Sequence, residues 1–175
     1  MRWAQLIVPE AMKSINKNWA DPNDYVRIIK KVNDAGIEVA SEMIIGLDTD
    51  TIETLDRTIE FVKKSNIIAP KFYCLTPIPG TVLNKEMKER GSIVDDNILE
   101  YRPSKSVNNT PHFSADEITE QYWRVYESLY TMKAILRRTI LNKRMLKHPF
   151  RTLFFFGTNM IYRKDIKRRV APNIF

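Results

Sequence analysis

The chain has 175 residues, of which 43% are hydrophobic, and this is enough for a packed core in one domain; its formal net charge is +7. A single cysteine, Cys74, excludes an internal disulfide and any metal or iron–sulfur site built from several cysteines. No apolar run reaches about 18 residues and the amino-terminal sequence lacks a signal-peptide pattern, so we expect a cytoplasmic location.

The charge is unevenly distributed along the chain. Residues 124–175 contain 13 Lys and Arg against 2 Asp and Glu, a net charge of +11. Residues 1–123 contain 15 Lys and Arg against 19 Asp and Glu, a net charge of −4. A basic tail on a weakly acidic body favours contact with an anionic membrane surface, nucleic acid or an acidic partner domain.

Two helices are predicted in the first part of the chain. Residues 10–17 form a short one, after a weak strand pattern at residues 6–8. Asp21 followed by Pro22 starts the second helix, because aspartate caps helices and proline fits their first position. Gly36 is expected to end that helix as a left-handed cap.

The next feature is an apolar run in residues 36–50 (GIEVASEMIIGLDTD), which predicts a strand and a glycine turn. With the helix that follows, it makes half of a βαβ unit. Ligands gather at the carboxyl ends of parallel strands, so the turn at Gly46 is the first candidate for a site. By the period of two, Glu42 lies on the face opposite Met43 and Ile45. A buried Glu42 would serve either a structural pair or the binding of substrate or cofactor.

A helix, a strand and another helix are expected next. Asp50 and Glu53 form a capping box for a helix that ends near Asn66. Residues 71–76 (KFYCLT) are typical of a strand, in which Cys74 is either an inert buried thiol, the favoured interpretation, or a reactive one. Residues 81–90 form a helix that threonine caps. The alternation predicts an α/β fold with right-handed crossovers.

The carboxyl-terminal part has a different pattern. Residues 92–113 are irregular and read as a connection. Ser114 and Glu117 form a capping box that starts one long helix, which Pro149 breaks. Residues 114–175 are therefore predicted to be a basic helical region.

Several segments carry a family resemblance. Residues 36–47, with the helix start at 51–54, resemble the fifth strand of radical S-adenosylmethionine (SAM) enzymes, where a glycine turn approaches the adenine. Residues 75–83 (LTPIPGTVL) are similar to the sixth strand and its exit in those enzymes. Residues 10–17 and the aromatic and basic carboxyl end resemble the cobalamin-binding subgroup. The resemblance implies a carboxyl-terminal half, truncated, in which residues 1–91 are the last βα units of a partial TIM-type barrel.

The resemblance also implies cofactors and a site. Intact members use SAM, an iron–sulfur cluster and cobalamin, but this chain lacks their CxxxCxxC cluster motif, so we expect it to be inactive alone and to bind none of them on its own. No catalytic or metal-binding residue is assigned. The implied cofactor-binding positions are Glu42, Ile44, Gly46, Leu75, Thr76 and Pro77. The expected partner is the missing amino-terminal barrel half, or a second copy through self-association.

Alternatives remain open from the sequence. Gly46 is either a close-approach position for a ligand or a simple turn glycine. The chain is alternatively a non-enzymatic binding module whose basic tail meets an anionic membrane, nucleic acid or a partner domain, with nucleic acid the least favoured. In that case the location is cytoplasmic but peripheral at the membrane. The phenylalanines at 154–156 either lie on lipid or, as we favour, pack against the body or a missing domain.

Overall fold

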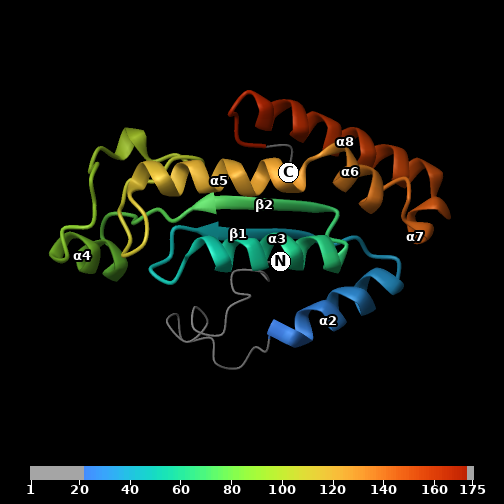
Figure 1. The fold of residues 1–175 in the computed structure, drawn as a ribbon, viewed down its shortest axis with the longest axis horizontal. Coiled ribbons are helices and arrows are strands. Elements are labelled where there is room, and N and C mark those ends of the chain that lie inside the picture. Colours follow the sequence, from blue (N-terminus) through green and yellow to red (C-terminus); the bar gives the residue numbers. More distant parts are fainter. Residues whose placement is uncertain (1–21, 173–175) are drawn as a thin grey trace.

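The computed structural model describes residues 22–172. The predicted strand at 6–8, the helix at 10–17 and the Asp21 cap lie outside the described residues. The elements are α2 (Pro22–Asp34), β1 (Ala40–Ile45), α3 (Ile52–Ser65), β2 (Ala69–Cys74), α4 (Val82–Glu89), the 3-10 helix η1 (Ile98–Glu100), α5 (Ala115–Leu129), α6 (Met132–Arg138), α7 (Lys143–Leu146) and α8 (Pro149–Lys167) (Figure 1). The α/β class is confirmed as a small parallel sheet among helices.

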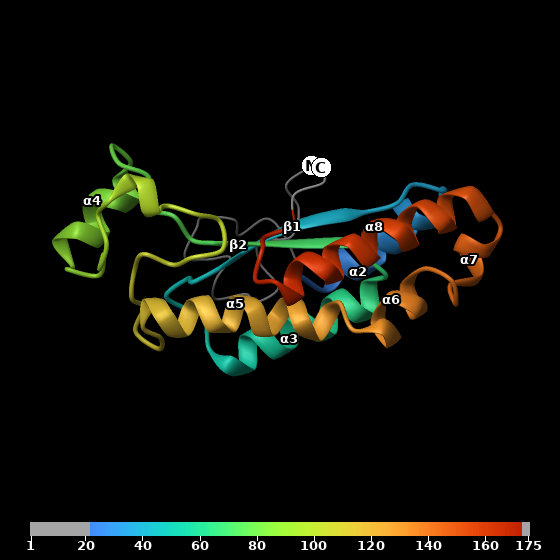
Figure 2. The ribbon, with the colours of Figure 1, turned by 90° about the horizontal axis from the view of Figure 1, so that it is seen from above.

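The sheet consists of two parallel strands in the described part of the chain. Ala40 lies opposite Ala69 and Ile45 lies opposite Cys74, so β2 begins and ends two residues earlier than predicted. The α3 and α5 helices pack side by side on one face of this sheet (Figure 2). Met43 is among the buried residues of that face, and Glu42 lies on the opposite face, as the period of two predicted.

Tyr126 of α5 and Tyr130, which caps the end of that helix, complete the outer edge of β2. The Tyr126 hydroxyl accepts a hydrogen bond from the Phe72 N–H at 2.8 Å, and the Tyr130 hydroxyl donates to the Pro70 carbonyl at 2.8 Å. Both hydroxyls are buried, so they replace the hydrogen bonds that a further strand would make. At the outer edge of β1, by contrast, no strand pairs within residues 22–172.

Replacing Tyr126 by phenylalanine tests this edge. The change leaves the buried Phe72 N–H without its acceptor, and we expect the free energy of unfolding to fall by about 1–2 kcal/mol in urea denaturation. Tyr25 is half-buried against the same core and provides the control. Tyr25→Phe should change the free energy by less than about 0.5 kcal/mol. Equal effects of the two substitutions would contradict the edge role of Tyr126.

The single long helix predicted from Ser114 to Pro149 is wrong. The Ser114 capping box is confirmed, but α5 ends at Leu129 and two short helices follow it. The side chain of Thr131 accepts a hydrogen bond from the Ala134 N–H and starts α6, which interrupts the helix despite continuous apolar spacing. Pro149 does not end a helix but opens α8, since proline fits the first turn.

The predicted capping box of α3 is shifted by one residue. Thr51, not Asp50, is the N-cap: its hydroxyl accepts from the Thr54 N–H at 3.2 Å, and the Thr54 hydroxyl accepts from the Thr51 N–H at 2.9 Å. Glu53 therefore takes no part in the cap. The end of α3 and the start of α4 are confirmed at Asn66 and Thr81, and Gly36 has the expected positive φ after α2.

Candidate functional site

The carboxyl ends of the two strands lie side by side. Leu75, directly after β2, donates its N–H to the Ile45 carbonyl at 2.8 Å. A Cβ built on Gly46 would lie 3.7 Å from the Leu75 Cβ. Two of the predicted cofactor-binding positions, Gly46 and Leu75, are thus neighbours at this edge of the sheet.

Gly46 has a structural role in the turn that follows β1. Its φ is +98°, a conformation that residues with a side chain rarely adopt. A Cβ at this position would lie 3.2 Å from the Ile118 Cγ2 of α5. The missing side chain therefore permits close packing of α5 against the turn, in addition to the backbone conformation. This contact explains the glycine without reference to a ligand, and the binding role stays a prediction.

Asp50 closes the same turn, whereas the sequence predicted that it caps α3. Its buried carboxylate accepts the N–H of Gly46 at 2.8 Å and the N–H of Leu47 at 3.0 Å. Burial raises the pKa of Asp50, and the two backbone hydrogen bonds oppose that shift. The spacing of an aspartate four residues after a turn glycine is the signal that would have indicated this role.

The raised pKa of Asp50 gives a pH dependence of known sign. Between its ordinary value of 3.8 and the raised folded value, the folded chain keeps a proton that the unfolded chain has lost. The contribution of Asp50 to stability therefore falls as the pH rises through that window. We expect the free energy of unfolding of wild type, minus that of Asp50→Asn, to decrease over the same range in urea denaturation. A difference that rises with pH, or stays constant, would contradict the shift.

Glu42 and Ile44 lie on the sheet face opposite α3 and α5. The expectation that Glu42 is a buried carboxylate is wrong, because its side chain is exposed, and it accepts a hydrogen bond from the Tyr73 hydroxyl at 3.4 Å. The cause is that no described element covers this part of the face. Ile44 is half-buried on the same face, one position before the end of β1.

Thr76 and Pro77 shape the exit from β2. The Thr76 hydroxyl donates to the Cys74 carbonyl at 3.2 Å, and the Pro77 carbonyl accepts from the Asn84 side chain at 2.8 Å. These contacts hold the turn against α4. A second link runs from Arg90, after α4, to Asp48 of the glycine turn at 2.6 Å, and it joins the two strand exits.

The described residues do not form a metal or cluster site. Cys74 is buried as expected, and burial raises the pKa of its thiol to about 12, so it is not a ready thiolate ligand. Within residues 22–172, no group of three or more His, Cys, Asp or Glu is arranged to hold a metal ion. An iron–sulfur cluster therefore does not fit the residues present, since its usual ligands are several thiolates. No helix in the described ranges is both long and apolar enough to cross a bilayer.

The chain is similar to parts of several proteins named methyltransferases. It is 29% identical over 141 residues to bacteriochlorophyllide d C-8(2)-methyltransferase of Chlorobaculum tepidum, covering 80% of the chain and 31% of that protein. Identity to the C-12(1)-methyltransferase of the same organism is 24% over 167 residues, 95% of the chain and 34% of the relative. Hopanoid C-2 methylase of Rhodopseudomonas palustris is 32% identical over 134 residues, 74% of the chain and 24% of the relative.

These alignments cover most of the chain but only part of each relative. The chain spans about a third or less of the length of the curated relatives it matches. No protein-family model matches it. Its relationship to methyltransferases thus concerns one region of those proteins.

Proposed function

We propose that the chain is the carboxyl-terminal portion of a radical SAM methyltransferase, with β1 and β2 as neighbouring strands of a partial TIM-type barrel. The observation that carries the proposal is the parallel strand pair whose strands are followed by Gly46 and Leu75, in a chain similar to three proteins named as methylases or methyltransferases. Support also comes from the outer edge of β1, which has no strand partner within residues 22–172 and is where an earlier barrel strand would pair.

In this proposal the strand ends form one wall of the SAM site. The half-buried Ile44 and Leu75 offer apolar surface for the adenine, and the turns at Gly46 and at residues 76–77 present backbone groups beside it. Asp50 holds the first turn in shape. This wall does not fit the cluster, so the thiolates, and any cobalamin site, would come from residues other than these.

The SAM wall is testable in a chimera in which this chain replaces the matching region of the C-8(2)-methyltransferase. We expect Ile44→Lys to weaken binding of S-adenosylhomocysteine at least about tenfold in equilibrium dialysis, because a charge would enter an apolar wall. Ile37 is 60% exposed and lies before the same strand, so Ile37→Lys is the matched control and should leave affinity unchanged. Unchanged affinity in folded Ile44→Lys chimera would contradict the assignment of the wall.

A further inference from the structure

The α8 helix exposes an apolar stripe. Phe150, Leu153, Phe154 and Ile161 follow helical spacing along one face, and their exposed fractions are 89%, 69%, 55% and 50%. In a surface helix of this kind the apolar face ordinarily lies against the core. Here the exposed side is apolar, which indicates a surface that meets something other than water.

Polar contacts on the opposite side fix the rotation of α8. The Asn159 amide donates to the Ile68 carbonyl at 3.1 Å, and its oxygen accepts from the Arg138 guanidinium at 2.9 Å. The Thr152 hydroxyl donates to the Met145 carbonyl at 2.6 Å. These groups are buried, so rolling the helix to hide the stripe would break their hydrogen bonds. The exposure of the stripe therefore follows from the packing of the whole helix.

Side chains of the neighbouring helices extend this apolar surface. Leu141 is 68% exposed and Leu146 is 56% exposed. With Phe150, Leu153 and Phe154 they form what we call the apolar tip. Beside it lies a cavity of about 180 Å³ that is lined by Ile140, Leu146, Pro149, Thr152, Leu153 and Phe156. Figure 2 shows α7 and α4 at opposite ends of the molecule, so the tip is remote from the strand exits.

The chain segment that carries the tip has charges of one sign. Residues 128–164 contain nine Lys and Arg and no Asp or Glu. Lys147 precedes the α8 stripe and Lys164 follows it, and both are exposed. Arg138 is buried and Arg144 and Arg151 face Glu38, so the exposed cations are Lys133, Arg137, Lys143, Lys147 and Lys164. Their positive charge is complementary to an anionic surface, while the tip itself is suited to an apolar one.

We propose that the apolar tip docks on an anionic phospholipid bilayer. The phenylalanine and leucine side chains enter the interface between headgroups and acyl chains, and the lysines face the lipid phosphates. An apolar anchor and a set of cations are the two features that interfacial helices combine to hold such a surface. Docking through this end would leave the strand exits at Gly46 and Leu75 facing away from the bilayer.

Cosedimentation of the full chain with lipid vesicles tests the proposal. We expect binding to vesicles that contain phosphatidylglycerol, at least about tenfold weaker binding to pure phosphatidylcholine, and weaker binding at high salt. The double variant Phe150→Ser, Phe154→Ser should bind anionic vesicles at least about tenfold more weakly. The matched control is Val82→Ser, Leu99→Ser, at positions that are 74% and 80% exposed elsewhere, and it should bind as wild type does.

Two results would overturn the proposal. One is equal vesicle binding by wild type and the folded Phe150→Ser, Phe154→Ser variant. The other is a wild-type dimer in sedimentation velocity that the same variant converts to monomer, together with no vesicle binding, since this would assign the tip to a second copy of the chain.

Discussion

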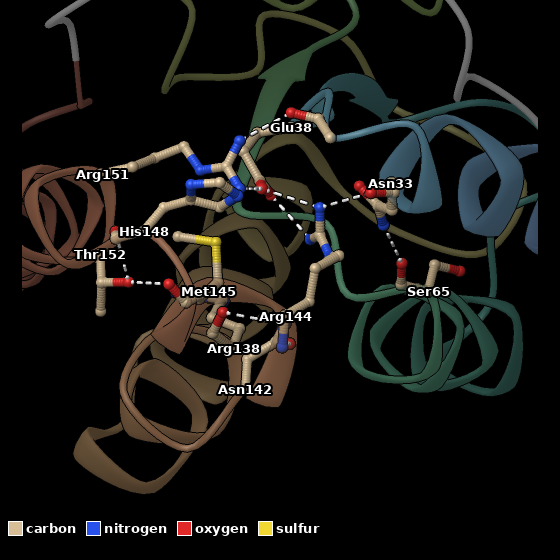
Figure 3. Close-up of polar contacts among 11 residues, drawn as sticks. Asn33, Glu38, Ser65, Arg138, Asn142, Arg144, Met145, His148, Arg151 and Thr152 are labelled. Carbon is tan, nitrogen blue, oxygen red and sulfur yellow. Dashed lines mark hydrogen bonds and ion pairs between the residues drawn. The ribbon is translucent and has the colours of Figure 1, made fainter.

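Glu38→Gln is expected to lower the free energy of unfolding by about 3 kcal/mol, because it removes a buried carboxylate and leaves two partly buried arginines without their counter-charge. Glu38 is 6% exposed and accepts from both terminal nitrogens of Arg144 at 2.8 Å (Figure 3). A second guanidinium, that of Arg151, lies 3.7 Å away. One carboxylate therefore balances two arginines from the carboxyl-terminal helices.

Glu38, Arg144 and Arg151, which we call the Glu38 cluster, join parts of the chain that are distant in sequence. Arg144 of α7 also donates to the Asn33 carbonyl at 2.9 Å, and Arg151 of α8 donates to the Gly36 carbonyl at 2.7 Å. These contacts fasten α7 and α8 to the segment that leads into β1. Losing the carboxylate should therefore weaken the attachment of the basic helical region to the sheet.

Urea denaturation with a matched surface pair checks this expectation. Glu53 and Arg57 form an ion pair at 2.6 Å on α3, with both side chains more than half exposed. Glu53→Gln should cost less than about 0.5 kcal/mol, because exposed pairs contribute little. If Glu38→Gln lost as little stability as Glu53→Gln, the Glu38 cluster would not hold the carboxyl-terminal helices to the sheet.

The second large effect is expected at the turn after β1. Gly46→Val should lower the free energy of unfolding by about 3 kcal/mol, since valine would be strained at φ +98° and would overlap Ile118. Urea denaturation measures the loss.

Gly36, which lies between α2 and β1, is a control with a similar backbone conformation. It has φ +84°, and a Cβ there would meet nothing within 4 Å. Gly36→Val should therefore show the backbone strain alone, about 1–2 kcal/mol. If the two valine variants lose the same stability, the close approach of α5 to Gly46 does not constrain the turn.

Local signals were sufficient for much of the fold. The glycine after α2, the turn at Gly46 and the threonine cap of α4 are each specified by neighbouring residues, so the order of elements from α2 to α4 is predicted correctly. The cap of α3 was misplaced because Asp50 and Thr51 are both good caps, and only the folded turn shows which hydroxyl or carboxylate is engaged. Thr131 was overlooked because apolar periodicity runs through it.

Contacts between distant residues could not be predicted. The two arginines of the Glu38 cluster lie more than 100 positions further along the chain, and no local pattern pairs them with it. The hydrogen bonds of Tyr126 and Tyr130 to β2 span 54 and 60 positions, so no local pattern predicts them either. The preferred prediction for residues 154–156 was packing against the body of the protein or a missing domain. Phe155 and Phe156 do pack against the core, whereas Phe154 is mostly exposed.

The measurement that tests the central claim most directly is anaerobic SAM cleavage by the C-8(2)-methyltransferase chimera, after loading with iron and sulfide. We predict reductive cleavage of SAM by the chimera, as by the intact relative under the same conditions, and none by the relative with the matching region deleted. A folded, cluster-loaded chimera that leaves SAM intact, beside an intact relative that cleaves it, would contradict the proposal that this chain is part of a radical SAM methyltransferase.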